Sequence, residues 1–242
     1  YSELLLRATL AHATARNCTP LFVTVFERHA RLVEFFETFG FDRLPERTSR
    51  GELVLWKPTL PAVGDTLSGL AFHVRYGPPR FDVHQAWHLV PIQPRFSHVL
   101  FPESRPDRLL FEGMHAFGNA IRKAYLCHSP TRRLDAGSVL VFYRTGPQAA
   151  LVAVGVTERV ICTTDPAEVS RAVAKRTVYT QAEIVDLCRK ELLVVLFRQC
   201  ILSPLSIPRR ELINAGIFNR PPQSIMCLTD HARLWLTSRL VG

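Results

Sequence analysis

The stretch from residue 118 to residue 143 restricts the fold of this chain more than any other part of it. It reads GNAIRKAYLCHSPTRRLDAGSVLVFY. The pattern predicts a basic, aromatic helix over Gly118–Leu126, then a short turn, then an apolar strand over Val139–Tyr143. Gly137 can adopt the backbone conformation that a tight entry to this strand requires. We therefore expect an α/β (α+β) fold in which helices alternate with buried strands.

Composition places the chain among folded proteins. Its 242 residues suffice for one large domain or two small ones, and 47% of them are hydrophobic, which argues against disorder. No apolar run approaches the ~20 residues that a bilayer span needs, and no secretory signal opens the chain, so we expect no membrane partner and a cytoplasmic protein. The six cysteines have no zinc-like spacing, so we expect no metal and reduced thiols that lie mostly in the core.

Positive charge is concentrated after residue 60. Residues 1–60 hold eight Lys or Arg against seven Asp or Glu, whereas residues 61–242 hold 22 against 14. A basic excess in one part of a chain favours a polyanionic partner for that part. The alternative is a solvated surface that happens to be basic.

Apolar runs and turn signals divide the chain into two parts joined by a linker. The first part, residues 1–58, is expected to hold helices over Leu4–Ala15 and Arg28–Thr38 and strands over Leu21–Val25, Phe41–Leu44 and Glu52–Lys57. Pro and Gly punctuate residues 59–80, which we interpret as the linker, with a brief strand at Leu70–Val74. In residues 81–242 the predicted strands are His84–Ile92, Ser97–Phe101, Val139–Tyr143, Ala149–Val156 and Leu192–Arg198. The predicted helices there are Gly118–Leu126, Pro166–Ala174, Gln181–Arg189, Pro208–Ala215 and Asp230–Ser238.

Residues 84–205 resemble the core of EVE domains, which are PUA-like barrels related to the YTH readers of methylated RNA. The resemblance is carried by the strand Val139–Tyr143 after Gly137, by the strand Leu151–Val156 and by the Asp-Pro at Asp165. Gly137 is followed here by Ser138, where the family has Asp. The resemblance implies that residues 81–242 form a PUA/EVE-like β-barrel with peripheral helices. It also implies that this barrel binds RNA or DNA and could accept one extruded, modified base.

Aromatic, amide and basic side chains in this region have the chemistry that such binding needs. Rings can stack on a base, an amide can hydrogen-bond to a base edge, and cations can neutralise phosphates. The candidate nucleic-acid-binding residues are Trp87, Asn119, Arg122, Lys123, Tyr125, Tyr143, Arg144, Lys175 and Arg176. Each has a structural alternative: the rings could fill the core, Asn119 could cap a helix, and the cations could be solvated.

Residues 1–57 resemble the C-terminal half of GNAT-family N-acetyltransferases. The segment Phe36–Phe41, FETFGF, matches that family's Tyr-Glu-Lys-x-Gly-Phe motif. Phe36 lacks the hydroxyl of the family's tyrosine, and His29 stands where an asparagine is common. The chain begins at Tyr1, after the point where the pyrophosphate-binding loop would lie, so we expect a processed or fragmentary chain. The resemblance implies acetyl-CoA as the cofactor of a complete parent protein and none in this chain, where His29 and Phe36 would be vestigial cofactor-side residues.

The leading hypothesis is thus a nucleic-acid-binding PUA/EVE-like protein fused to an incomplete acetyltransferase domain. The alternative is an acetyl-CoA-dependent N-acetyltransferase whose C-terminal barrel binds a protein or a small ligand. In a third interpretation, the open edge of the sheet in residues 1–57 pairs with a second copy of the chain or with the missing N-terminal half. The sequence shows no Gly-x-Ser-x-Gly element and no paired carboxylate cluster that would favour a hydrolase or nuclease.

Overall fold

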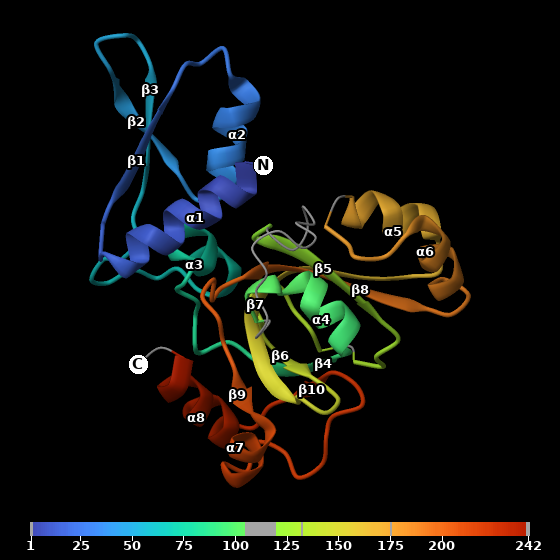
Figure 1. Ribbon diagram of the computed structural model, residues 1–242. Helices are drawn as coiled ribbons and strands as arrows, with labels where there is room; N and C mark the ends of the chain where they lie inside the picture. The colour runs from blue at the N-terminus through green and yellow to red at the C-terminus, as the bar shows by residue number, and fades with distance from the viewer. Residues whose placement is uncertain (1, 105–119, 132, 175, 241–242) are drawn as a thin grey trace.

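The computed structural model describes residues 2–104, 120–131, 133–174 and 176–240. The fold is mixed α/β, with two separate sheets (Figure 1). The helices are α1 Ser2–Ala15, α2 Ala30–Thr38, α3 Gly69–Tyr76, α4 Pro94–Leu100, α5 Pro166–Val173, α6 Gln181–Leu187, α7 Arg209–Asn214 and α8 Asp230–Leu240, with a 3-10 turn at Pro102–Ser104. The strands are β1 Leu21–Val25, β2 Asp42–Arg47, β3 Leu53–Lys57, β4 Trp87–Ile92, β5 Arg122–Cys127, β6 Val139–Arg144, β7 Ala150–Thr163, β8 Leu192–Gln199, β9 Ile207–Pro208 and β10 Met226–Cys227.

The first sheet is small and antiparallel, in the order β1-β3-β2, and it packs against α1 and α2. All five elements expected in residues 1–58 are present, with ends that differ by a few residues. Gly40 ends α2 in the left-handed region, at φ +79°, a conformation that glycine adopts readily at the end of a helix. A side chain at Gly40 would also collide with the carbonyl of Val74 on α3. Gly40 therefore permits both the turn and the close approach of α3.

The second sheet has seven strands and carries two hydrophobic clusters, one on each face. Its path is β10-β4-β6-β7-β8-β5, with β9 paired to β7, and only β4 and β6 run parallel to each other. Leu212 and Leu236, from α7 and α8, cover one face, whereas Leu100 from α4 covers the other. Burial on both faces explains why β6, the first half of β7 and most of β8 are continuous apolar runs and not alternating ones.

The sheet curves so that β5 and β4 approach each other across its inner side. Figure 1 shows α4 lying between these two strands, with the sheet around it. The Tyr125 hydroxyl on β5 donates a hydrogen bond of 2.6 Å to the carbonyl of Pro91 on β4. Within the described residues, however, no backbone ladder joins β5 to β4 or β10, so the expected β-barrel is not closed.

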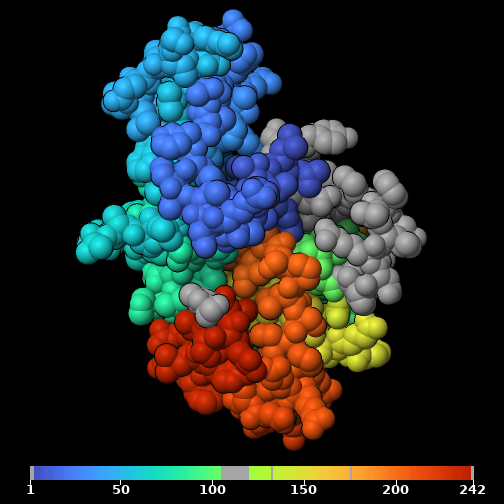
Figure 2. All heavy atoms as spheres, turned by 60° about the vertical axis from the view of Figure 1, so that its left-hand side comes forward, coloured from blue at the N-terminus to red at the C-terminus, as the bar shows by residue number. Residues whose placement is uncertain are grey.

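The two parts of the chain are in direct contact. Arg7 on α1 forms a 2.9 Å ion pair with Glu103 and donates to the side chain of Gln199 at 3.1 Å. Figure 2 shows the N-terminal segment, in blue, resting on the segment near residue 200, in orange. Ile121 also belongs to the hydrophobic cluster of the first part. The boundaries at 1–58, 59–80 and 81–242 remain a prediction.

Three expected elements are wrong in type. The expected strand Leu70–Val74 is helix α3, and the expected strand Ser97–Phe101 is largely helix α4, which begins at Pro94. The expected helix Gly118–Leu126 is strand β5 over its described C-terminal part. In β5, Tyr125 and Cys127 pack towards α4, while Ala124 and Leu126 pack in the cluster beneath α5 and α6. This alternation with period two, satisfied by pairing with β8, outweighs the helical propensity of the sequence.

No helix among the described residues is long and apolar enough to cross a membrane. The same residues contain no group of three or more His, Cys, Asp or Glu that could hold a metal ion. Only two of the six cysteines are buried, so the expectation of mostly core thiols is wrong; the buried pair is Cys188 and Cys200.

Candidate functional site

A cavity of about 600 Å³ lies in the gap between β4 and β5. We call it the aromatic cavity. Its lining comes from the end of β4, from α4, from β5 and the turn after it, from the turn after β6, from the loop before α6 and from the loop before β10. The lining residues are Pro91, Ile92, Gln93, Phe96, Tyr125, Leu126, Cys127, His128, Ser129, Thr145, Gly146, Tyr179, Pro221, Pro222, Gln223, Ser224 and Ile225.

Three aromatic rings line this cavity. The rings of Phe96 and Tyr179 have their centroids 4.8 Å apart and are tilted by 43°. The Arg95 guanidinium lies 4.3 Å from the centroid of Phe96. Tyr125 contributes a third ring, which is held in place by its hydrogen bond to Pro91. Flat apolar faces of this kind are suited to stacking on a planar ligand.

The position of Tyr179 is fixed by the start of α6. Thr180 is the N-cap of that helix and forms a capping box with Glu183, in which each side chain accepts from the other residue's backbone N–H. The Tyr179 N–H donates in turn to the Thr177 hydroxyl at 3.2 Å. The ring thus projects from a hydrogen-bonded turn, which lowers the entropy that a ligand must remove on binding.

The edge of the aromatic cavity is polar but carries no carboxylate among its described lining residues. His128 lies 3.0 Å, through Nδ1, from the carbonyl oxygen of Glu191. Because a carbonyl can only accept, Nδ1 carries the proton and Nε2 of the neutral ring is an acceptor. Gln93, Gln223 and Ser224 add amide and hydroxyl groups. This set can pair with both donors and acceptors of a neutral ligand and does not repel an anionic one.

Two ionisable groups of the lining, Cys127 and Tyr179, are held in their neutral forms. Burial raises the pKa of the Cys127 thiol to about 11 and that of the Tyr179 hydroxyl to about 12. Both groups therefore stay protonated near neutral pH. A protonated thiol is a poor nucleophile, so this lining favours binding over covalent catalysis by Cys127.

Two exposed arginines adjoin the lining residues. Arg95 precedes Phe96 and donates to Gln93 at 3.2 Å, and Arg220 precedes Pro221. Neither forms an ion pair within the described part of the chain, although the charge of Arg95 helps to lower the pKa of Glu183. Because both side chains are exposed, their charges remain available to a polyanion.

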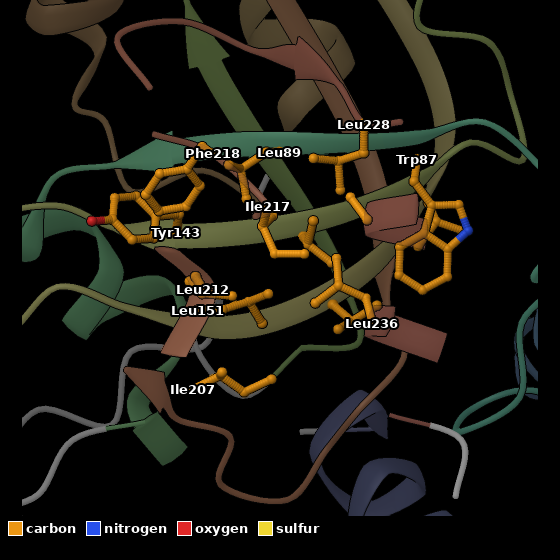
Figure 3. Close-up of a cluster of buried hydrophobic side chains, with 14 of the residues drawn as sticks. Trp87, Leu89, Tyr143, Leu151, Ile207, Leu212, Ile217, Phe218, Leu228 and Leu236 are labelled. Atoms are coloured by element: carbon orange, nitrogen blue, oxygen red, sulfur yellow. The ribbon is translucent and has the colours of Figure 1, made fainter. Parts of the chain in front are cut away.

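Of the predicted rings, only Tyr125 lines the aromatic cavity. Trp87 and Tyr143 lie in the cluster on the opposite face of the sheet, each 1% exposed (Figure 3). The Trp87 indole donates to the carbonyl of Val83 at 3.1 Å, and the Tyr143 ring packs edge-on to Phe218. Their burial does not support a stacking role, which stays a prediction.

The predicted cations do not form one surface. Arg122 pairs with Glu3 at 2.8 Å, and Arg176 pairs with Glu158 at 2.9 Å. Lys123 is fully buried, and its amine donates to the carbonyl of Leu100 at 2.7 Å. These contacts do not support phosphate binding by the three residues, which stays a prediction.

The remaining predicted nucleic-acid contacts fall in two groups. Asn119 and Lys175 lie outside the described residues. Arg144 lies beside the turn after β6 and lines a separate cavity.

The two residues assigned to a vestigial acetyl-CoA side lie at opposite ends of α2. His29 is the exposed N-cap residue, whereas the Phe36 ring packs against Phe41 at 5.1 Å. Seven residues of helix separate them by ~10 Å along the axis. Neither residue lines the aromatic cavity, and the acetyl-CoA assignment stays a prediction.

Sequence reasoning missed Phe96, Tyr179 and His128. Tyr179 had a usable signal, because it directly precedes the Thr180 and Glu183 pattern that starts a helix. Phe96 could be placed only once α4 was recognised as a helix. His128 follows β5, whose strand character the sequence hides.

No family model matches this chain, and no curated protein matches it. Solved structures to which it is similar include ASCH from Zymomonas mobilis, at a TM-score of 0.44 and 14% identity over 63% of this chain and 94% of that one. A single-residue variant of that protein gives a TM-score of 0.47 at 12% identity, over 63% and 95%. Rpa0253 from Rhodopseudomonas palustris gives 0.35 at 13% identity, over 64% and 93%. Likeness at these values assigns neither a family nor a function, and nothing in it supports the acetyltransferase resemblance.

Proposed function

We propose that this chain binds RNA or DNA and accepts one unstacked base in the aromatic cavity. The cavity itself is the observation that carries the proposal, because its three rings line a space of about 600 Å³. That volume lies within the range of ~300–1,000 Å³ found for sites that enclose small organic groups. A nucleobase offers the two features that the lining fits, a planar face and an edge with donors and acceptors.

Charge supports the same class of ligand. The chain carries a formal net charge of +9. Arg95 adds exposed positive charge against the lining residues Gln93 and Phe96, and the exposed Arg220 directly precedes the lining residue Pro221. Both could contact phosphates that flank an inserted base. A lining without carboxylates, next to exposed arginines in the sequence, suits a base with its backbone better than it suits a cationic metabolite.

Binding of short single-stranded RNA and DNA, followed by fluorescence anisotropy at several salt concentrations, tests the proposal. Tyr179→Ala should weaken binding by roughly 5- to 150-fold, because a stacked base contributes ~1–3 kcal/mol. Phe22→Ala is the matched control, since that ring is 59% exposed on the first sheet, away from the cavity. A 2-aminopurine placed in the oligonucleotide should lose fluorescence in the wild-type complex and recover it in Tyr179→Ala.

Two outcomes would overturn the proposal. One is the absence of measurable affinity for any RNA or DNA at low salt. The other is an equal effect of Tyr179→Ala and Phe22→Ala, which would place binding elsewhere on the protein.

A further inference from the structure

A second cavity, of about 630 Å³, lies on the other side of the β6–β7 turn from the aromatic cavity. Thr145 and Gly146 line the aromatic cavity, while Pro147 and Gln148, the next two residues, line the second one. Arg144, the last residue of β6, also lines the second cavity. We call it the arginine cavity. A single short turn therefore separates the two spaces.

Arg144 carries a buried positive charge that no described residue neutralises. Its side chain donates to the carbonyl of Gln148 from Nε at 3.1 Å and from Nη2 at 3.0 Å, and to the carbonyl of Ser104 from Nη1 at 3.4 Å. The residue is 5% exposed, and no carboxylate among the described residues lies within ion-pair distance of it. A buried cation held only by neutral carbonyls is unfavourable unless an anion approaches it.

The acidic residue in the same cavity is already occupied. Glu103 forms an ion pair with Arg7 at 2.9 Å and accepts a hydrogen bond from the Gln199 side-chain amide. It therefore does not serve as the counter-charge of Arg144. A guanidinium has five N–H donors, and three hydrogen bonds leave two for a ligand.

Two arginines, which we call the rim arginines, adjoin the lining of the arginine cavity in the sequence. Arg209 and Arg210 directly follow Pro208, which lines the cavity, and both are exposed. The Arg209 N–H donates to the carbonyl of Ala149 at 3.0 Å, which fixes this rim beside the β6–β7 turn. Neither arginine has a carboxylate partner among the described residues.

We propose that the arginine cavity binds a phosphate group, with Arg144 as its buried charge partner and the rim arginines as its outer contacts. The inference rests on the proposed function, because the phosphate would belong to the nucleic acid whose base enters the aromatic cavity. The chain of that ligand would cross the β6–β7 turn. The phosphate is either an internal diester or a terminal monoester, and both present oxygens to the two remaining N–H groups.

Inorganic phosphate tests the cavity without any base. In wild-type protein, the Nε–Hε resonance of Arg144, assigned with Arg144→Gln, should shift saturably as phosphate is added at constant ionic strength. The matched control is Arg159→Gln, which removes an exposed charge from β7 and should leave the shift intact. A resonance that does not move, or moves equally with chloride, overturns the inference.

Oligonucleotides then identify the source of the phosphate. Arg144→Gln should weaken binding of a short oligonucleotide by roughly tenfold or more and lower the salt slope by ~1, whereas Arg159→Gln should not. Dinucleotides with a 5′-phosphate, with a 3′-phosphate and with neither separate a terminal group from an internal diester. An unchanged salt slope in folded Arg144→Gln overturns the inference.

The two proposals fail in distinguishable ways. If phosphate shifts the Arg144 resonance but no oligonucleotide binds, the phosphate site is supported and the nucleic-acid-binding function is refuted. If oligonucleotides bind but phosphate and Arg144→Gln have no effect, the nucleic-acid-binding function is supported and the phosphate site is refuted. Should Arg144→Gln fail to fold, the phosphate titration of wild-type protein decides alone, with Arg144→Lys assigning the resonance by its loss.

Discussion

Lys57 is a fully buried lysine that ties β3 to the end of α3. Its amine donates to the carbonyls of Val74 and Arg75, both at 2.7 Å. Burial, followed by the nearby charges of Arg198 and Arg75, lowers the Lys57 pKa from 10.5 to about 7. The carbonyls at the C-terminal end of a helix favour a cation, but not enough to offset the desolvation. The shift corresponds to a cost of roughly 5 kcal/mol for keeping the amine charged in the folded state.

The sign of the pH dependence follows from the lowered pKa. Below pH ~7 both states bind the proton, so the full cost is present. Between pH ~7 and ~10.5 the unfolded chain binds more protons, so the free energy of unfolding rises with pH. From pH ~7 to ~9 this residue alone should add about 2 kcal/mol of stability.

Urea unfolding of wild-type protein and Lys57→Met at pH 7 and pH 9 measures the effect. The mutation also removes two hydrogen bonds, but that loss is the same at both pH values and cancels in the difference between them. We expect the wild type to gain about 2 kcal/mol relative to Lys57→Met on going to pH 9. The exposed Lys190→Met controls for the loss of one positive charge. A stability difference between wild type and Lys57→Met that is constant with pH would refute the reasoning.

Two further predictions concern contacts between segments and the chemistry of the cavity. Arg7→Met should lower the free energy of unfolding, measured in urea, by ~3–5 kcal/mol, because it leaves the buried Glu103 carboxylate without its ion pair. Arg16→Met, which removes an exposed arginine of the same segment, should lower it far less. Equal losses in the two variants would contradict the role of the ion pair. The partly buried Cys127 should react with iodoacetamide more slowly than the exposed Cys18, since desolvation raises its pKa to about 11. Bound oligonucleotide should slow it again. Peptide mapping by mass spectrometry measures both rates, and equal labelling of the two thiols would contradict the raised pKa and partial burial of Cys127.

The sequence predicts elements well where one period dominates. Strands β6 and β8 are short apolar runs of leucine, valine and aromatic residues, and α5 begins with the Asp165-Pro166 cap. Their types and approximate ends can therefore be predicted from the sequence. The left-handed conformation of Gly40 at the end of α2 is equally predictable, because a glycine after an amphipathic run is typical of a helix end. The strand at residues 122–127 could not be predicted in this way. Its sequence, RKAYLC, suits a helix in isolation and forms a strand because it pairs with β8.

The candidate site was harder to predict because residue type does not reveal which face of a sheet a ring occupies. Trp87, Tyr125 and Tyr143 have the same stacking chemistry, yet only Tyr125 faces the gap between β4 and β5. The cations show a similar limit: a sequence cannot show that Arg122 meets Glu3, more than a hundred residues away. The charge excess after residue 60 indicates a class of partner, whereas pairing decides which charges remain available to it.

The aromatic cavity can be traced to incomplete closure of the sheet. Among the described residues, β10 pairs only with His88 and Leu89, so Pro91 and Ile92 at the end of β4 receive no strand on that side. Pro91 also lacks the N–H that a further ladder would use. The Tyr125 hydroxyl supplies one hydrogen bond to the Pro91 carbonyl where a neighbouring strand would supply several. A small closed barrel would fill its interior with side chains, whereas this interrupted edge leaves a space lined by Phe96, Tyr125 and Tyr179. The same feature that prevents a barrel therefore creates the room for a ligand.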